Sequence, residues 1–263
     1  MPDILSPHNE RVRYAVRLRE RRYRQQEGQM LVEGVYELTL ALHSGLQPRT
    51  VFLCEELARE RPAALLALQP LTVSRAAFAK MSYRENPDGW LAIFPCPRRT
   101  LESLALSATP LLILTEAVEK PGNLGAILRT ADAAGVDGVL VCDPRADLYN
   151  PNVVRASRGT LFTVPAIETS NAAALTYLRA HGISLLATTP QAEALYTEVN
   201  LSQPLCIAVG AEDEGLSPFW LRQADWQVRI PMQGRVNSLN VATATAIVLY
   251  EALRQRAQVS RAR

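Results

Sequence analysis

Three polar loops carry most of the side chains in this 263-residue chain that could do chemistry. They are residues 119–131 (EKPGNLGAILRTA), 210–215 (GAEDEG) and 231–240 (PMQGRVNSLN). Their glycines allow the backbone to bend and to approach a bound molecule closely. All three histidines lie outside these loops, so general-base catalysis by histidine has little support. Any chemistry here therefore depends on arginine, asparagine, glutamate, serine and backbone amides.

Each loop also has an ordinary structural explanation when it is taken alone. Arg129 could be a salt-bridged surface side chain, and the three carboxylates of 210–215 could form a solvated acidic turn. Asn123 could cap the helix predicted after the first loop, and Ser238 or Asn240 could cap the last helix. The presence of three such loops in one chain is what favours a functional site.

Each loop follows an apolar run that has the length and composition of a buried strand. These runs are residues 111–115, 205–209 and 226–230. Open α/β sheets bind ligands at the carboxyl ends of their strands. We therefore predict that 205–209 and 226–230 end in adjacent loops, and that the start of a long helix completes a binding site there.

Strand-like and helix-like runs alternate from residue 110 to the end of the chain. The predicted strands are residues 111–115, 138–142, 161–164, 183–187, 205–209 and 226–230. The predicted helices are residues 123–134, 152–158, 171–180, 218–224 and 239–255. Nearly continuous apolar strands joined through helices favour an α/β fold with a mostly parallel sheet and helices on both faces.

A smaller α/β unit is predicted before residue 95. Its strands are residues 30–32, 50–54, 71–73 and 90–94, and its helices are residues 33–44, 55–68 and 75–81. The stretch after it contains several prolines and few long periodic runs. We therefore predict domains at 1–95 and 110–263, joined by a linker at 96–109.

The N-terminal part of the chain is locally basic. Seven arginines and one acidic residue, Glu20, lie between residues 11 and 24. Val12 and Val16 could seat a single helix over this stretch and leave the arginines outward. Such a face is either solvated or in contact with nucleic-acid phosphates. The candidate phosphate-binding residues are Arg11, Arg13, Arg17, Arg19, Arg21, Arg22 and Arg24.

Composition excludes several classes of protein. With 48% hydrophobic residues, 21% charged residues and a net charge of +2, the chain is typical of globular proteins. Its four cysteines lack metal-site spacing, so no metal is predicted, and Cys142 and Cys206 are expected in the core. The absence of a signal-like or membrane-spanning run predicts a soluble, cytoplasmic protein. Walker A and GxGxxG motifs are also absent, which disfavours an NTPase or an ordinary NAD enzyme.

Three segments in order, NLGAILRTA, VGAEDEGL and IPMQGRVNSLNVATATA, resemble the three motifs of the SpoU/TrmH family. This family of the SPOUT superfamily comprises RNA ribose 2′-O-methyltransferases that use S-adenosylmethionine. The resemblance covers roughly residues 110–256. The N-terminal stretch NERVRYAVRLRERRYRQQEGQMLVEGVYELTLAL, with ENPDGWLAIF, is similar to the L30e-like substrate-binding domain of rRNA-modifying members.

The resemblance implies a fold, an assembly and a set of site residues. It implies a deep trefoil knot after residue 205, a homodimer, and an active site completed across the dimer. The residues that match catalytic motif positions are Asn123, Arg129, Glu212, Ser238 and Asn240. The residues implied to hold S-adenosylmethionine are Thr188, Val209, Gly210, Ile230, Met232, Ser238 and Leu239.

The implied function is methylation of a ribose 2′-hydroxyl in RNA, with no DNA or membrane partner. The N-terminal domain favours large-subunit rRNA. The alternatives are a tRNA ribose methyltransferase, an antibiotic-resistance enzyme acting on the same rRNA, and a non-catalytic RNA-binding or ribosome-assembly protein. The family's catalytic arginine corresponds to Arg129, either as a base or as a cation that orients phosphate or stabilises the developing alkoxide. The second role suits arginine better because its side chain stays protonated in proteins.

Overall fold

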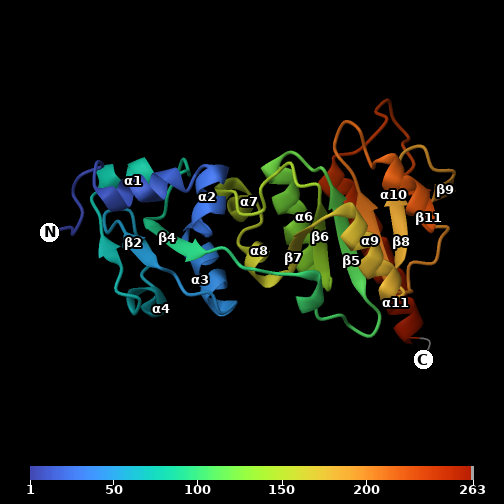
Figure 1. The fold of residues 1–263 in the computed structure, drawn as a ribbon, viewed down its shortest axis with the longest axis horizontal. Helices are drawn as coiled ribbons and strands as arrows, with labels where there is room; N and C mark the ends of the chain where they lie inside the picture. Colours follow the sequence, from blue (N-terminus) through green and yellow to red (C-terminus); the bar gives the residue numbers. More distant parts are fainter. Residues whose placement is uncertain (262–263) are drawn as a thin grey trace. The chain divides into compact units, whose positions relative to one another are not determined.

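The computed structural model describes residues 1–261, and the burial of side chains as far as Val259. Internal packing divides the chain into two compact units (Figure 1). The first unit comprises Met1–Arg98 and Tyr149–Thr163, and the second comprises Arg99–Leu148 and Val164–Arg263. Residues 149–163 therefore pack with the N-terminal unit. The functional division into 1–95, 96–109 and 110–263 stays a prediction.

The second unit is built around a seven-stranded sheet in which every pairing is parallel. The strand order is β7-β6-β5-β10-β8-β11-β9. The strands are β5 Leu111–Glu116, β6 Gly138–Cys142, β7 Ala166–Thr169, β8 Ser184–Thr188, β9 Ala194–Leu195, β10 Leu205–Val209 and β11 Trp226–Arg229. The helices are η1 Leu101–Ser103, α6 Pro121–Ala134, α9 Asn171–Ala180, α10 Pro218–Gln223 and α11 Val241–Arg261. The predicted parallel α/β sheet is confirmed, and the knot stays a prediction.

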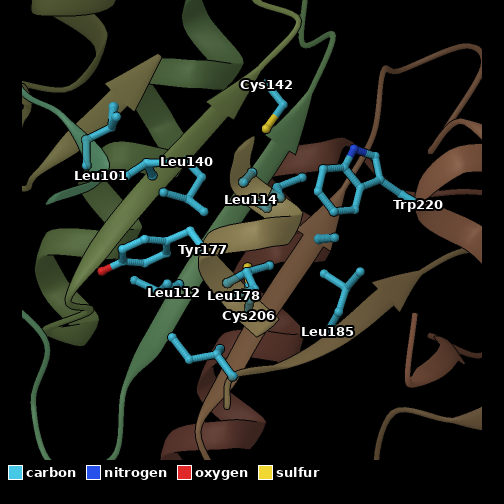
Figure 2. Close-up of a cluster of buried hydrophobic side chains, with 14 of the residues drawn as sticks. Leu101, Leu112, Leu114, Leu140, Cys142, Tyr177, Leu178, Leu185, Cys206 and Trp220 are labelled. Atoms are coloured by element: carbon cyan, nitrogen blue, oxygen red, sulfur yellow. The ribbon is translucent and has the colours of Figure 1, made fainter. Parts of the chain in front are cut away.

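The apolar runs become strands because both faces of this sheet are covered. β5, β6 and β10 are buried at every position, as expected for central parallel strands. Figure 2 shows one face of the core, where Leu112, Leu140 and Leu185 meet Trp220 and Cys206. Cys142 and Cys206 are core residues, as predicted. Burial raises the pKa of both thiols, which keeps them protonated.

Two predictions for this half of the chain are wrong. Residues 161–164 do not form a strand, because Thr160–Thr163 is the short helix α8 and the strand β7 begins at Ala166. Short apolar runs do not distinguish the two structures by periodicity. The strands β10 and β11 are also not neighbours, since β8 lies between them and β10 instead pairs with β5.

The first unit contains a four-stranded sheet of order β1-β4-β2-β3, in which only β2 and β3 are parallel. The strands are β1 Gln29–Glu33, β2 Thr50–Leu53, β3 Leu71–Thr72 and β4 Trp90–Pro95. The helices are α1 Glu10–Arg17, α2 Arg21–Glu27, α3 Val35–His43, α4 Ala63–Leu66, α5 Arg75–Met81, α7 Pro151–Ala156 and α8 Thr160–Thr163. The predicted helix over 55–68 shrinks to the four residues of α4, which follow Pro62.

The basic segment forms two helices instead of the single predicted helix over 11–24. α1 ends with Leu18 as its C-cap, and α2 begins after Glu20, which has an extended backbone. Six of the seven arginines are exposed, as predicted. Arg24 is the exception, since its side chain is 2% exposed and its guanidinium donates to the carbonyl of Leu18 at 2.8 Å. Arg24 therefore serves the turn between the helices and is removed from the phosphate-binding set.

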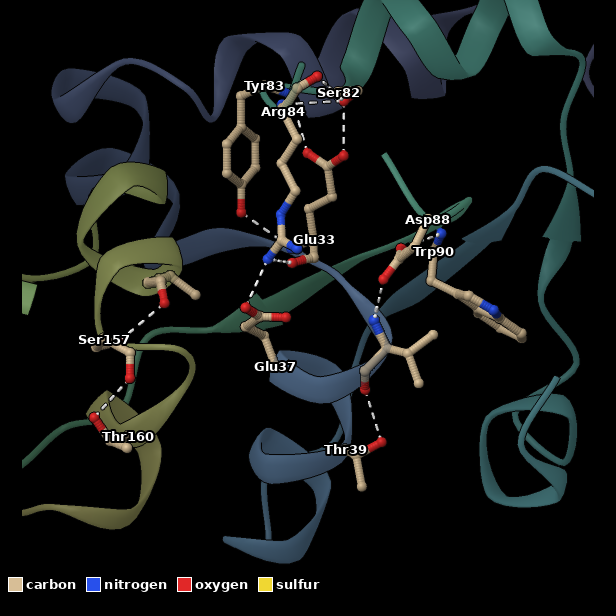
Figure 3. A network of polar contacts seen from close by, with 12 residues as sticks. Glu33, Glu37, Thr39, Ser82, Tyr83, Arg84, Asp88, Trp90, Ser157 and Thr160 are labelled. Carbon is tan, nitrogen blue, oxygen red and sulfur yellow. Dashed lines mark hydrogen bonds and ion pairs between the residues drawn. The ribbon is translucent and has the colours of Figure 1, made fainter. Parts of the chain in front are cut away.

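A buried polar cluster joins the strand β1 to the segment before β4 (Figure 3). The carboxylate of Glu33 accepts hydrogen bonds from the Ser82 hydroxyl at 2.7 Å and the Tyr83 amide at 3.0 Å. Arg84 donates to the carbonyl of Glu33 at 2.6 Å and pairs with Glu37 at 2.7 Å. Burial raises the pKa of Glu33 despite these donors. The ion pair therefore lies in a poorly solvated region where an unpaired charge is costly.

We expect Arg84→Met to lower the free energy of unfolding by about 3 kcal/mol, because it leaves the buried carboxylate of Glu37 without its partner. Adding Glu37→Gln should recover part of the loss. The matched control is Arg61→Met, whose pair with Glu55 is about half exposed and should change stability by less than about 1 kcal/mol. Denaturant unfolding of the four proteins measures this, and equal effects of Arg84→Met and Arg61→Met contradict it.

Candidate active site

Three of the predicted site residues form a continuous chain of hydrogen bonds in the second unit. The amide of Asn123, in the first turn of α6, donates to the carboxylate of Glu212. The amide of Asn240, directly before α11, donates to the side-chain oxygen of Asn123 at 3.1 Å. Residues 117 positions apart in sequence are therefore joined through two asparagine side chains. The loops that follow β5, β10 and β11 meet at this point.

The charge of Glu212 is stabilised by these contacts. Burial alone would raise the pKa of its carboxyl, but the Asn123 amide and nearby backbone N–H groups lower the pKa below its ordinary value. One of these donors is the N–H of Glu119, 3.4 Å from the carboxylate. Glu212 is therefore an ionised hydrogen-bond acceptor at neutral pH. Its geometry suits holding the amide of Asn123, whose oxygen then faces Asn240.

The loop that carries Glu212 is closed on itself. Ala211 and Gly215 exchange two backbone hydrogen bonds of 3.1 and 2.9 Å. A Cβ atom at Gly210 would lie only 2.0 Å from the carbonyl carbon of Gly215, so a side chain cannot be accommodated there. Gly215 itself has φ of +70°, a conformation that favours glycine. The two glycines thus explain the tight turn that sets the position of Glu212.

A buried carboxylate at the end of β5 fixes the far end of the same loop. Glu116 is 4% exposed and accepts from the Ser217 amide and hydroxyl, both at 2.7 Å. It also accepts from the side chain of Asn171, the first residue of α9, at 3.0 Å. Asn171 in turn accepts from the indole N–H of Trp220 at 3.2 Å. Glu116 therefore anchors the loop after β10 to the neighbouring strand.

Arg145 connects the rims of two of these loops. Its guanidinium pairs with Glu119 after β5 and with Glu214 after β10, the latter at 3.2 Å. All three side chains are substantially exposed, so the pairs contribute little stability and weaken with salt. They do bring a cation to the loop that holds Glu212.

The two asparagines differ in their relation to the helices. Asn240, not Ser238, caps α11, since its side-chain oxygen accepts from the amides of Ala242 at 3.0 Å and Thr243 at 3.4 Å. The helix accordingly begins at Val241, two residues later than predicted. Asn123 does not cap α6, which begins at Pro121 after Lys120. Its side chain is instead committed to Glu212 and Asn240.

Arg129 and Ser238 are not part of the hydrogen-bonded chain. Arg129 lies six residues after Asn123 on α6, which places it about 120° around the helix and about 9 Å along it. Its side chain is exposed and forms no hydrogen bond or ion pair within the described part of the chain. Ser238 is also exposed, and its hydroxyl lies 3.5 Å from the side-chain oxygen of Asn237.

The residues implied to hold the cofactor lie at strand ends that surround this chain. Val209 ends β10 and Gly210 follows it, Ile230 follows β11, and Thr188 ends β8, which lies between those two strands. The hydroxyl of Thr188 is buried and has no hydrogen-bond partner within residues 1–261. Over the same described residues, the backbone of 232–239, which includes Met232 and Leu239, makes no hydrogen bond. The buried, unpartnered hydroxyl of Thr188 fits a polar, nucleoside-containing ligand, and the exposed backbone of 233–239 is open to such a ligand as well as to solvent.

Sequence reasoning missed Glu116 and Arg145. An acidic residue that ends an otherwise apolar strand, LLILTE, was a usable signal for Glu116, because a buried carboxylate requires donors. The loop that contains Arg145 carried no comparable signal. Among the described residues, no cluster of three or more histidine, cysteine or acidic side chains could hold a metal. None of the described helices is both long and apolar enough to cross a membrane.

Comparison with protein families identifies two matches along the chain. Residues 110–250 match the SpoU rRNA Methylase family, and residues 9–92 match the MRM3-like substrate binding domain. The first match includes all three loops that meet at Asn123. The second includes the sheet of the first unit and the basic helices α1 and α2.

Similar proteins extend over nearly the whole chain. The 23S rRNA (guanosine(2553)-2′-O)-methyltransferase RlmP of Bacillus subtilis is 32% identical, over 95% of this chain and 98% of the relative. A 23S rRNA (uridine(2479)-2′-O)-methyltransferase of Streptomyces viridochromogenes is 33% identical, over 91% and 87%. The crystal structure of the SpoU methyltransferase AviRb from Streptomyces viridochromogenes, in complex with the cofactor AdoMet, superposes with a TM-score of 0.86 at 30% identity, over 95% and 99%.

We expect Asn123→Ala to raise the pKa of the Glu212 carboxyl, because the side-chain donor is lost while the burial remains. Because the pKa of Glu212 is lower in the folded than in the unfolded protein, its ionisation stabilises the fold at any pH above the unfolded-state pKa. This stabilisation is lost as the pH falls through the folded-state pKa, and the variant should lack it at neutral pH. Carbon-13 NMR titration of glutamate carboxyls measures the change. The control is Asn200→Ala, an exposed asparagine of the same unit, and an unchanged Glu212 titration in Asn123→Ala contradicts the assignment.

Proposed function

Because the chain belongs to the SpoU rRNA methylase family, we propose that it transfers a methyl group from S-adenosylmethionine to a ribose 2′-hydroxyl of large-subunit rRNA. The observation that carries the proposal is the chain of hydrogen bonds from Glu212 through Asn123 to Asn240. It joins the three matched segments at the carboxyl ends of β5, β10 and β11, strands of one parallel sheet, where open α/β sheets bind ligands. The matched substrate-binding domain favours rRNA over tRNA.

S-adenosylmethionine supplies an electrophilic methyl group on a sulfonium, which becomes a thioether when the methyl is transferred. The strand-end residues Val209, Gly210 and Ile230 would hold its nucleoside through their main chain, together with the loop that contains Met232, Ser238 and Leu239. The hydroxyl of Thr188 provides a buried hydrogen-bonding group at the same edge. The tight turn at Gly210, where the backbone of Gly215 leaves no room for a side chain, sets the course of the loop at this edge.

The reacting ribose hydroxyl would pass its proton to solvent water as its oxygen gains the methyl group and the sulfonium is left as a neutral thioether. Negative charge develops on that oxygen in the transition state, and a cation placed beside it lowers the barrier. Arg129 is the exposed cation that the sequence motif supplies, and its guanidinium also suits a bidentate contact with the RNA phosphate. We assign it this electrostatic and positioning role instead of a role as general base. Asn123 and Asn240 hold the surrounding loops in place.

Arg129 reaches the site from a second subunit in this proposal. Within one chain it lies about 120° around α6 from Asn123, and among the described residues it makes no hydrogen bond to the chain of Glu212, Asn123 and Asn240. The second unit also exposes large apolar side chains, namely Val236 and Leu239 in the loop before α11 and Tyr250 on α11. On α11 the exposed Thr243, Tyr250 and Ala257 follow one another every seven residues, so they form one stripe along the helix. A homodimer that covers these residues and completes the site accounts for both features.

The target nucleotide is not set by family membership. The two relatives at 32% and 33% identity are named for a guanosine and a uridine. If the substrate were tRNA, or if the protein had no catalytic role, mapping of ribose methylation would give a different result. We therefore expect ribose-methylation mapping of total RNA, with and without the gene, to show one 2′-O-methyl missing from large-subunit rRNA. A change confined to tRNA overturns the rRNA assignment, and failure of the purified protein to bind S-adenosylmethionine overturns the enzymatic one.

The variants Arg129→Ala and Arg129→Lys test the electrostatic role. Arg129→Ala should lose roughly 100- to 1,000-fold in methylation rate, the size expected when one charge-stabilising donor is removed. Arg129→Lys should keep substantial activity because the cation remains. Loss of activity in Arg129→Lys with RNA and cofactor binding intact contradicts a simple cation role.

Mixed dimers test whether Arg129 acts across the subunit interface. Arg129→Ala and Asn123→Ala homodimers should both be impaired. A purified heterodimer of the two should regain one intact site if Arg129 serves the partner's Asn123, and no intact site if both residues serve their own subunit. Differently tagged subunits, co-expressed and separated by two affinity steps, provide the sample, and no gain in rate contradicts the shared site.

A further inference from the structure

The first unit has two connected hollows around one aromatic residue of α1. A hollow of about 380 Å³ opens beside β2, and a larger groove of about 740 Å³ runs along α1 towards α5. Arg11 and Tyr14 line both, so they form the wall that the two share. The smaller hollow is within the range of small-ligand sites, about 300–1,000 Å³.

The register of α1 explains why these side chains lie together. Val12 and Ala15 are fully buried against the sheet and α5, as is Leu18, the C-cap. Arg11, Tyr14 and Arg17 follow one another every three residues and share a neighbouring face. Tyr14 is therefore flanked by a cation one turn before it and another one turn after it.

The larger groove is strongly cationic. It is lined by the cations Arg11, Arg13, Arg17 and Lys80, against the single carboxylate of Glu10. None of these cations forms an ion pair with a carboxylate within residues 1–261. Their charge is consequently available to an anionic ligand. Regular spacing of cations along a groove is typical of contact with a phosphate backbone.

Aromatic rings and guanidinium groups alternate along this face. The Cζ atom of Arg17 lies 5.8 Å from the ring centre of Tyr14 and 5.7 Å from that of Tyr23. Arg22 lies 5.0 Å from the ring centre of Tyr23. Both kinds of planar group stack on unpaired nucleobases. The face therefore offers stacking surfaces as well as charge.

The smaller hollow has a mixed lining around Tyr14. Phe52 and Ile93 are among its apolar lining residues and are almost fully buried, while Arg11, Arg49 and Gln69 supply polar groups. Gln69 is exposed and has φ of +53°, a left-handed conformation that is uncommon outside glycine. A flat base with apolar faces and polar edges matches this combination better than an extended peptide does.

We propose that the hollow at Tyr14 receives an unstacked base of single-stranded RNA, and that the groove of Arg11, Arg13, Arg17 and Lys80 holds the adjoining phosphates. This rests on the proposed function in taking RNA as the substrate, and it adds where and in which form the first unit grips that RNA. A double helix is disfavoured because its bases are not free to enter the hollow. Tyr14 is the stacking platform and Arg49 the cation at the far rim.

Binding of the full-length protein to a single-stranded RNA oligomer, followed by fluorescence anisotropy across a salt series, tests the proposal. Tyr14→Leu should weaken binding roughly five- to hundredfold, the range for loss of one stacked base, and leave the salt dependence unchanged. Arg11→Gln and Arg49→Gln should each reduce the slope of log K against log salt by about 0.7. Tyr14→Phe keeps the ring and should bind as the wild type does.

The matched control is Arg19→Gln, which removes the same charge from an exposed arginine of the segment that lines neither hollow. It should affect affinity less than Arg11→Gln does. An oligomer with one abasic position should bind the wild type less tightly while binding Tyr14→Leu unchanged. Equal losses in Arg19→Gln and Arg11→Gln, or equal affinity of Tyr14→Leu and the wild type, overturn the proposal.

Photocrosslinking of the wild-type protein to an oligomer containing 5-bromouridine provides a test that needs no variant. Mass spectrometry should find the crosslink on Tyr14, and crosslinks confined to other peptides overturn the proposal.

Cofactor binding, measured in parallel by calorimetry, separates this inference from the proposed function. Tyr14→Leu should bind S-adenosylmethionine as the wild type does. Weak RNA binding with intact cofactor binding then supports a role of the hollow in RNA binding and leaves the enzyme assignment untouched. Failure of the wild-type protein to bind S-adenosylmethionine would instead contradict the assignment as a methyltransferase.

Discussion

The hydrogen bond between Asn123 and Glu212 is the interaction on which the rest of the site depends. A carboxylate taken partly out of water needs donors, and the asparagine amide supplies one from a different strand-end loop. Once that amide is committed, the side-chain oxygen of Asn123 has a fixed direction and accepts from Asn240. Asn240 has its own oxygen tied to the first turn of α11. The start of the last helix is thereby set by a carboxylate in the loop after β10.

This arrangement requires the Glu212 loop to be stiff, and two features make it so. The loop is too tight at Gly210 for any side chain, and its far end is bonded to the buried carboxylate of Glu116. Glu116 ends β5, while Gly210 follows β10, and these two strands pair along their full length. Sheet pairing therefore fixes the distance between the two anchors. The loop keeps little freedom except at its exposed residues, Asp213 and Glu214.

Most of the sheet was predictable from sequence because β5, β6, β8 and β10 are short, largely apolar runs separated by helices or loops. The strand β7 was misplaced at 161–164, and the two-residue β9 was missed. The three loops were identifiable from their glycines and motif residues. The sequence-based predictions that failed concern contacts between residues far apart in the chain. Asn123 and Ser238 have the residue types of helix caps, and only the position of Glu212 and Asn240 shows that neither acts as one. Arg24 belongs to a run of exposed arginines, yet a carbonyl left free at the turn after α1 draws it inward. Residues 149–163 pack with the N-terminal unit through contacts that no local pattern encodes.

The separation of Arg129 from the other motif residues follows from helix geometry. Asn123 and Arg129 stand in one short motif, but six residues on a helix turn their side chains about 120° apart. In a single subunit the two side chains therefore leave different sides of α6. Either the arginine serves RNA phosphates outside the hydrogen-bonded chain, or a second copy of the chain supplies it. The proposed second copy would also cover the exposed apolar residues Val236 and Leu239 of the loop before α11 and Tyr250 on that helix. A single dimer would then both place the guanidinium of Arg129 at the site and bury these apolar side chains.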